Sequence, residues 1–253
     1  MKRYLALTVA ACAALIACAT TPSLDMQREA QARMQMGMTY LEQRNLSSAM
    51  RELTKASELD PVNPEIDVAL GLAYQARGDL GKAAEYFRSA LRKKPGYPEA
   101  HNDLGIVLSQ LGRGEEALRE FEAAASDVLY PTPEWAYYNM GEEFRRRGNA
   151  VKAEEMYRRS MALNHRYMDS YLRLALIQGD RGRWEEAART LEACVAAAPT
   201  FAPAWLDLGR AYLSLGRRQD AEKAFQSALT NSADPALRKQ ASDFLGAPGS
   251  DNK

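Results

Sequence analysis

The chain has 253 residues, with 33 Lys and Arg balanced by 33 Asp and Glu, and only three cysteines. A neutral balance gives no electrostatic drive toward nucleic acid, so we expect no nucleic-acid partner. So few cysteines also exclude the disulfide framework on which many small secreted domains depend.

The first residues have the order of charges and apolar side chains that is typical of an export signal. Lys2 and Arg3 precede an apolar segment, residues 4–17, which is too short to cross a membrane as a helix. It ends in Leu15-Ile16-Ala17-Cys18, which resembles a bacterial lipobox. The resemblance implies that residues 1–17 are a lipoprotein signal peptide, cleaved before Cys18, and that Cys18 is acylated.

Two alternatives to this interpretation stay open. Val9-Ala10-Ala11-Cys12 also fits the lipobox pattern, although cleavage before Cys12 would leave a very short apolar segment. An ordinary signal peptide with incidental cysteines is the other. By the same resemblance, Ala19 in place of aspartate favours the outer membrane, so we expect lipid anchoring at its periplasmic face, because several acyl chains anchor a protein durably. Residues 18–29 would then be the lipidated cysteine, a tether and the start of a helix.

A period of 34 residues organises the chain from about residue 30 to residue 235. Steps of 34, with a single step of 36, meet the small residues Gly37, Gly71, Gly105, Gly141, Ala175 and Gly209. Twelve places after each stands an alanine, and four places further stands Leu53, Phe87, Phe121, Tyr157, Leu191 or Phe225. Such regularity is the signature of a repeat array.

The pattern resembles the tetratricopeptide repeat. The resemblance implies an all-α, right-handed superhelical solenoid of six helix pairs, at 30–63, 64–97, 98–131, 134–167, 168–201 and 202–235. In the second pair we expect helices at 64–77 and 80–93, joined by a turn at Gly78-Asp79. Asp234-Pro235 has the form of a helix start, so a capping helix is expected at 236–245 and a disordered tail at 246–253.

In such arrays the first helix of each pair lines a concave groove. The geometry of the resembled family places the inward side chains three before, one after and four after the small residue. The N-terminal half of the groove is then apolar and rich in methionine, through Met34, Met38, Leu41, Val68, Leu72 and Ile106. Methionine is frequent on peptide-binding surfaces, and an exposed apolar stripe usually marks an interaction site. The alternative is that these residues are repeat core, or are covered by an N-terminal helix extension at 25–32.

The 36-residue step marks an irregular joint between the third and fourth repeats. Pro131 and Pro133 make the chain extended and stiff there, and aromatic residues surround them. Tyr130, Trp135 and Tyr138 are therefore a possible second contact patch. The alternative is that these aromatic side chains fill a widened gap between repeats.

Nothing in the chain has the pattern of a catalytic or metal site, and we expect a protein that is not an enzyme. His101 and His165 stand in separate repeats, outside any metal-ligand spacing such as H-E-x-x-H. Cys194 occupies a small-residue position of its repeat, which favours a buried, inert thiol. No cofactor is expected beyond the covalent lipid on Cys18.

The lipobox, six repeats, capping helix and a Tyr-Pro-x-Pro-Glu joint leading into Asn-x-Gly together resemble the type IV pilus pilotin family of outer-membrane lipoproteins. The resemblance implies that the lipoprotein binds the secretin subunit of the pilus. It also implies that the lipoprotein-sorting machinery carries the pair to the outer membrane, where the secretin assembles for pilus biogenesis and motility. The alternative function is an envelope adaptor that recruits peptidoglycan hydrolases or outer-membrane assembly factors.

Overall fold

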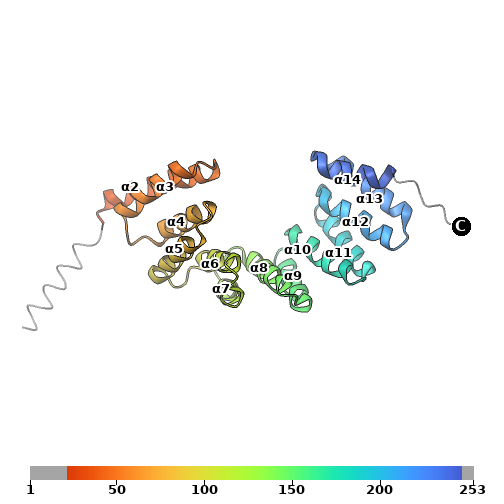
Figure 1. Cartoon of the computed structure of the whole chain (residues 1–253), viewed down its shortest axis with the longest axis horizontal. Coiled ribbons are helices and arrows are strands. Elements are labelled where there is room, and N and C mark those ends of the chain that lie inside the picture. The colour runs from red at the N-terminus through yellow and green to blue at the C-terminus, as the bar shows by residue number, and fades with distance from the viewer. Residues whose placement is uncertain (1–21, 247–253) are drawn as a thin grey trace, which may run out of the picture. The chain divides into compact units, whose positions relative to one another are not determined.

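The computed structural model of the chain describes residues 22–246. This range consists of thirteen α-helices joined by short turns, and it contains no strand (Figure 1). The all-α repeat fold expected from the 34-residue period is confirmed. The expected signal peptide, Cys12, Cys18 and nearly all of the expected C-terminal tail lie outside the described residues.

The chain forms two compact units that divide between Asp127 and Val128, at the joint where the period changes. Unit 1 contains three helix pairs: α2 (Leu24–Glu42) with α3 (Leu46–Leu59), α4 (Pro64–Ala76) with α5 (Leu80–Lys93), and α6 (Pro98–Gln110) with α7 (Gly114–Ser126). Each helix packs mainly on its neighbours in sequence, as expected for a repeat array.

Unit 2 contains three further helix pairs and a final single helix. The pairs are α8 (Pro133–Arg146) with α9 (Ala150–Leu163), α10 (Met168–Asp180) with α11 (Trp184–Ala197), and α12 (Ala202–Ser214) with α13 (Arg218–Asn231). Helix α14 (Pro235–Gly246) covers the outer side of the last pair: Ala241 is buried there, and the Phe244 ring stacks on Phe225 with 4.7 Å between centroids.

The helix ends follow from local sequence. At the start of α5 the Asp79 side chain accepts a hydrogen bond from the Lys82 backbone N–H, which satisfies a donor that the first turn leaves free. Asn45 and Asn149 do the same for α3 and α9. Proline two residues after the last helical residue prevents α3, α5 and α11 from continuing.

The turn inside each repeat requires a residue in the left-handed region. Gly78 has φ +83° in the second repeat. Glycine with a positive φ holds the same place in the turns of the four later repeats, at Gly112, Gly148, Gly182 and Gly216. The first repeat is different, because Arg44 occupies this place with φ +58°. Within the described residues Arg44 is the only residue other than glycine with a positive φ.

The periodic small residues set the distance between the two helices of a pair. A Cβ atom on Gly105 would lie 2.5 Å from the Phe121 ring, and one on Gly209 would lie 2.5 Å from the Phe225 ring. The aromatic ring therefore fills the space that the glycine leaves. In the fifth repeat Ala175 replaces the glycine and the smaller Leu191 replaces the ring.

Candidate partner-binding site

The expected groove residues all belong to unit 1 and stand on its three first helices, α2, α4 and α6. Met34, Met38 and Leu41 share one face of α2, because residues four and three apart lie above one another on a helix. Leu72 and Ile106 hold the matching place on α4 and α6, and contacts between α2 and α4 and between α4 and α6 make these helices neighbours.

Burial divides this set of residues in two. Met34 and Val68 are only 8% and 9% exposed, and Met34 packs with Ala30, Leu53 and Leu70 in the unit 1 core. These two side chains therefore correspond to the repeat-core alternative and are corrected from groove surface to core. Sequence spacing identified their face, but it could not show how closely the neighbouring helix covers them.

Four residues remain half-buried and available, and we call them the apolar stripe: Met38, Leu41, Leu72 and Ile106. They are not covered by residues 25–32, because these residues continue α2 as one helix from Leu24 to Glu42 and do not fold back. Beyond the stripe the surface is polar, and the Gln75 side chain donates a hydrogen bond to Gln110 at 3.5 Å.

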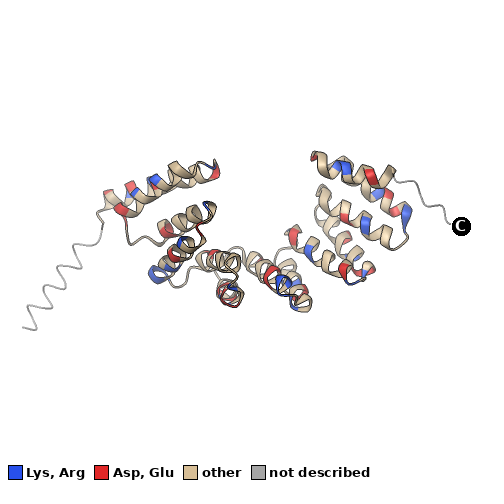
Figure 2. Cartoon of the chain, in the orientation of Figure 1, with Lys and Arg blue, Asp and Glu red and all other residues tan. Residues whose placement is uncertain are grey.

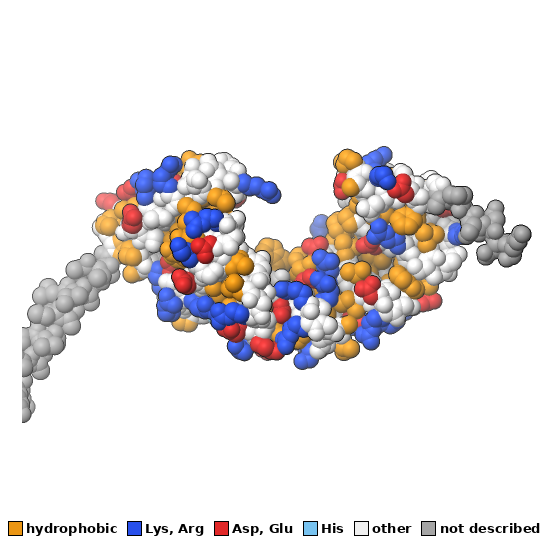
Figure 3. All heavy atoms as spheres, in the orientation of Figure 1, with side chains coloured by type: hydrophobic (Ala, Val, Ile, Leu, Met, Phe, Trp, Pro, Cys, Tyr) orange, Lys and Arg blue, Asp and Glu red, His pale blue; other side chains and the backbone are white. Residues whose placement is uncertain are grey.

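Two basic side chains of unit 1 form ion pairs within the unit. Arg33 contacts Glu29 at 2.7 Å and Glu52 at 2.9 Å, and Lys93 contacts the buried Asp67 at 2.5 Å. Basic and acidic residues alternate over the helices of both units (Figure 2), and hydrophobic side chains appear between them on the visible surface (Figure 3). These pairs leave little net charge on Arg33 and Lys93, so a partner of the stripe would bind mainly through apolar contact.

One acidic side chain of α6, Asp103, has a raised pKa. Burial raises the pKa of the Asp103 carboxyl to about 6, against a hydrogen bond from Asn102 that lowers it. Asp103 stands three residues before Ile106, in the helix that carries one end of the apolar stripe. Its charge therefore changes in a range close to neutral pH.

The aromatic residues of the joint do not form one exposed patch. Tyr130 is 5% exposed and so is buried, whereas Trp135 is 48% exposed. Tyr138 packs at 5.8 Å from the Tyr157 ring and edge-on at 5.3 Å from the Tyr167 ring. The exposed second patch is therefore corrected: Tyr130 is buried, Tyr138 is half-buried against two aromatic rings of unit 2, and Trp135 is the exposed member of the three.

Two apolar residues that the sequence analysis did not single out are exposed at the joint. Val128 and Leu129 are 95% and 85% exposed, directly before the buried Tyr130. Their exposure could have been predicted from the sequence, because both follow the end of α7 and precede Pro131, where the chain is not helical. They precede Trp135 by seven and six residues and add exposed apolar surface to this segment.

The inward positions of the fourth repeat form a polar network in place of apolar surface. The Tyr157 hydroxyl donates to Glu142 at 2.5 Å, and Arg145 and Arg173 contact the same carboxylate at 2.9 and 3.3 Å. Burial alone would raise the pKa of Glu142, but the bonds from Arg145 and Tyr157 outweigh it and lower the pKa. The same burial, with the Glu142 charge, raises the pKa of Tyr157. These groups satisfy one another, so the network holds unit 2 together.

The described residues bring together no group of three His, Cys, Asp or Glu side chains that could hold a metal ion. Cys194 is buried beside the Met168 sulfur at 3.5 Å, and burial raises the pKa of its thiol to about 12. His101 hydrogen-bonds the Glu120 carboxylate through Nδ1 at 2.7 Å and the Pro95 carbonyl through Nε2 at 3.1 Å. Between residues 22 and 246, no helix is long and apolar enough to cross a membrane.

Family models of the tetratricopeptide repeat match residues 34–98, 68–132 and 180–241. Among curated proteins the chain is similar to the type IV pilus assembly protein PilF of Pseudomonas aeruginosa, with 29% identity over 144 residues, which is 57% of each chain. It is also 31% identical over 114 residues to the peroxisomal targeting signal receptor of Saccharomyces cerevisiae, covering 45% of this chain and 18% of the receptor. The alignments thus span less than two thirds of either relative.

Solved structures give the same fold. The chain matches PilW, described as a widely conserved type IV pilus biogenesis factor, with a TM-score of 0.69 and 25% identity over 83% of this chain and 97% of that chain. The Pseudomonas aeruginosa PilF structure matches with a TM-score of 0.70 over 85% of this chain and 97% of that chain, at 22% identity. The helix pairs, the family models and these relatives agree: the chain is a tetratricopeptide-repeat protein related to the type IV pilus assembly proteins PilF and PilW.

Proposed function

We propose that this protein is a pilotin, an outer-membrane lipoprotein that binds the type IV pilus secretin and promotes its targeting to the outer membrane and its assembly. The similarity to PilF and PilW supports a role in pilus biogenesis. The observation that carries the binding role is the apolar stripe, Met38, Leu41, Leu72 and Ile106, which stays half-buried on three neighbouring helices.

The stripe suits an apolar segment of the secretin, such as a helix that lays one face on it. Helix-in-groove recognition uses apolar anchors at helical spacing, and the flexible methionine side chain adapts to the shape of its partner. In the same unit, Arg33 and Lys93 are already paired with Glu52 and Asp67. Binding would therefore come mainly from buried apolar area, about 25 cal/mol per Å².

The test is capture of the secretin from detergent-solubilised envelopes with the lipidated protein as bait. The double variant Met38→Glu and Leu72→Glu places two carboxylates in the stripe and is expected to abolish capture. The matched control, Val62→Glu with Leu111→Glu, changes two exposed apolar residues outside the stripe, which are 53% and 40% exposed, and should capture the secretin normally.

Circular dichroism would show that both double variants keep their helices. Normal capture by the folded stripe variant would refute the assignment of the stripe. Recovery of peptidoglycan hydrolases or assembly factors without any secretin would refute the pilotin role and favour the envelope-adaptor function.

Membrane anchoring belongs to the same proposal and rests on the lipobox at Cys18. Cells fed an alkynyl fatty acid should label the natural protein and a Cys12→Ser variant, but not a Cys18→Ser variant. The natural protein should also fractionate with the outer membrane. Label in the Cys18→Ser variant would show that Cys12 carries the lipid instead. No label in any of the three proteins would refute the proposal that the protein is a lipoprotein.

A further inference from the structure

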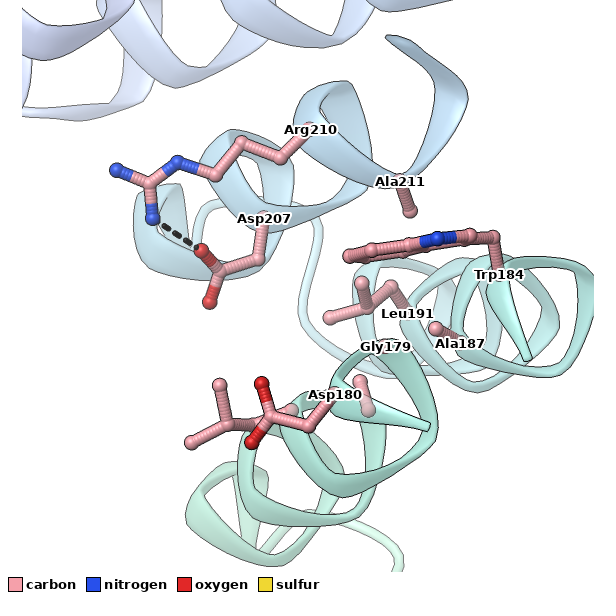
Figure 4. A pocket seen from close by; sticks show the side chains of 10 residues that line it. Gly179, Asp180, Trp184, Ala187, Leu191, Asp207, Arg210 and Ala211 are labelled. Atoms are coloured by element: carbon pink, nitrogen blue, oxygen red, sulfur yellow. Dashed lines mark hydrogen bonds and ion pairs between the residues drawn. The ribbon is translucent and has the colours of Figure 1, made fainter. Parts of the chain in front are cut away.

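Unit 2 contains a pocket that the proposed function does not use. It has a volume of about 150 Å³ and lies among the three consecutive helices α10, α11 and α12 (Figure 4). Pockets for drug-sized ligands run to about 300–1,000 Å³, so this one has the size for a single side chain. Helices α10 and α12 are the first helices of their pairs, which places the opening on the face that repeat arrays use for binding.

A glycine at an inward position of the fifth repeat lies in the wall of the pocket. Gly179 stands four places after the small residue Ala175, where the other repeats carry Leu41, Gln75, Ser109, Arg145 and Leu213. The Trp184 ring lies over the glycine, so that a Cβ atom there would be 2.6 Å from the ring. The preceding Gln178 is buried and accepts a hydrogen bond from Thr190 at 2.8 Å, so it leaves the space open.

The pocket combines apolar walls with carboxylates at one side. Leu176, Trp184 and Leu191 provide apolar surface, together with the small side chains of Ala175, Ala187 and Ala211. Figure 4 shows the carboxylates of Asp180 and Asp207 on the same side, with the indole ring of Trp184 on the other. An occupant therefore needs an apolar stem and a group that complements negative charge.

The two carboxylates differ in their partners. Asp207 accepts from Arg210 at 2.9 Å, and the same guanidinium donates to Gln240 of α14 at 2.8 Å, so this pair is held within unit 2. The Asp180 carboxylate makes no ion pair or side-chain hydrogen bond with any of the described residues. With one paired and one unpaired carboxylate, the charge lining the pocket is a net −1.

We infer that this pocket binds the lysine or arginine side chain of a partner peptide, with the aliphatic stem against Leu176 and Leu191 and the cation beside Asp180. Basic side chains bury their methylene stem along apolar surface while the charge stays at the edge, and this pocket has both parts. An acidic side chain would meet the unpaired carboxylate and is excluded.

The test uses the natural mature protein and three synthetic pentapeptides, acetyl-Ala-Ala-X-Ala-Ala-amide with X lysine, norleucine or glutamate. Binding is read from the indole N–H resonance of Trp184 by NMR, assigned with a Trp184→Phe variant. The lysine peptide should shift this resonance saturably below about 10 mM, which is a weak but measurable affinity. The norleucine peptide should bind about fivefold more weakly, and the glutamate peptide should not bind.

Charge variants decide whether Asp180 is the recognition group. Asp180→Asn should weaken the lysine peptide about fivefold, and Asp180→Lys should abolish its binding. Glu222→Lys makes the same charge change at an exposed position of α13 and should leave binding intact. Higher salt should weaken binding of the lysine peptide to the natural protein, until its affinity approaches that of the norleucine peptide.

Equal affinity for the lysine and norleucine peptides, or unchanged binding in Asp180→Lys, would overturn the cationic assignment. The absence of any saturable shift would refute the inference that the pocket binds a peptide side chain. These results are independent of secretin capture, because the stripe of unit 1 takes no part in them. The pilotin proposal and this inference can therefore fail separately.

Discussion

Gly71 and Phe87 are in direct contact across the α4–α5 pair, where a Cβ atom on the glycine would lie 2.6 Å from Cε1 of the ring. Phe87 is fully buried, so the ring cannot move aside without displacing the core. In an open helix, replacing glycine by alanine gains up to about 1 kcal/mol. Here we expect Gly71→Ala to destabilise the chain by about 1–3 kcal/mol, because overpacking outweighs that gain.

The measurement is the urea midpoint followed by circular dichroism. The control is Gly81→Ala in the first turn of α5, where the nearest atom to a Cβ is the Asp79 carboxylate at 4.0 Å. This variant should be neutral or slightly more stable. Equal midpoints for the two variants would contradict the close-contact account of the repeat.

Glu154 is a buried carboxylate on which three arginines converge. Arg183 bonds it directly, Arg158 contacts it at 3.1 Å and Arg181 at 3.5 Å. Burial would raise its pKa, but the bonds from Arg183 and Arg158 outweigh burial and lower it. The stability it contributes is therefore present above the pKa of glutamate in the unfolded chain, and is lost as the pH falls through the lower folded-state pKa.

Glu154→Gln should accordingly lower the free energy of unfolding by about 1–3 kcal/mol at pH 7, and by much less near pH 3. Glu155→Gln is the matched control, since Glu155 pairs with Arg159 in the same i, i+4 geometry but both side chains are more than half exposed. It should cost at most about 1 kcal/mol. Equal losses at the two sites would show that burial does not strengthen the pair.

His101 should titrate above its ordinary pKa of 6.5, because its hydrogen bond to the Glu120 carboxylate raises the pKa against an opposing effect of burial. The stability from this pair is then fully present below the unfolded pKa and is lost as the pH rises through the raised folded value. NMR of the imidazole protons as a function of pH measures the pKa of His101 directly. Glu120→Gln should lower the pKa, whereas Glu122→Gln, at an exposed position two residues away, should leave it in place.

Cys194 should resist thiol reagents in the folded protein. Its side chain is fully buried, and burial raises the thiol pKa to about 12, so almost no thiolate forms at pH 8. In a chain without residues 1–18 it is the only cysteine. We expect its reaction with Ellman's reagent to be at least about a hundredfold slower than in urea. A Ser242→Cys variant supplies an exposed thiol as control, and equal rates would disprove the burial.

The 34-residue period of the sequence was enough to predict most of the fold. It placed the helix pairs and the close contacts of Gly71 and Gly105, because those depend on residues inside one repeat. The exposure of single side chains was harder to predict: Met34 and Val68 have inward spacing, yet both are buried, and Met34 packs with residues of α3 and α4. Tyr130 likewise could not be assigned to the interior from composition alone.

The pocket of unit 2 lay beyond sequence reasoning for another reason. Gly179 differs from the residues at the same place in the other repeats, but the sequence does not show which neighbouring side chain lies against it. The cavity appears only once Trp184 of the next helix is placed over it. Similarly, the Glu142 network needs Arg173 from the following repeat, 31 positions along the chain.

The turns within the repeats determine where such a protein can be rebuilt. Five of the six turns use a glycine with positive φ at the same place, so a whole repeat could be spliced in or removed there without reshaping the backbone. A splice at the first turn would carry Arg44, whose left-handed backbone costs about 1 kcal/mol relative to glycine. For an engineer, the first hairpin is thus the part to leave untouched, or to repair with Arg44→Gly before the array is shortened or extended.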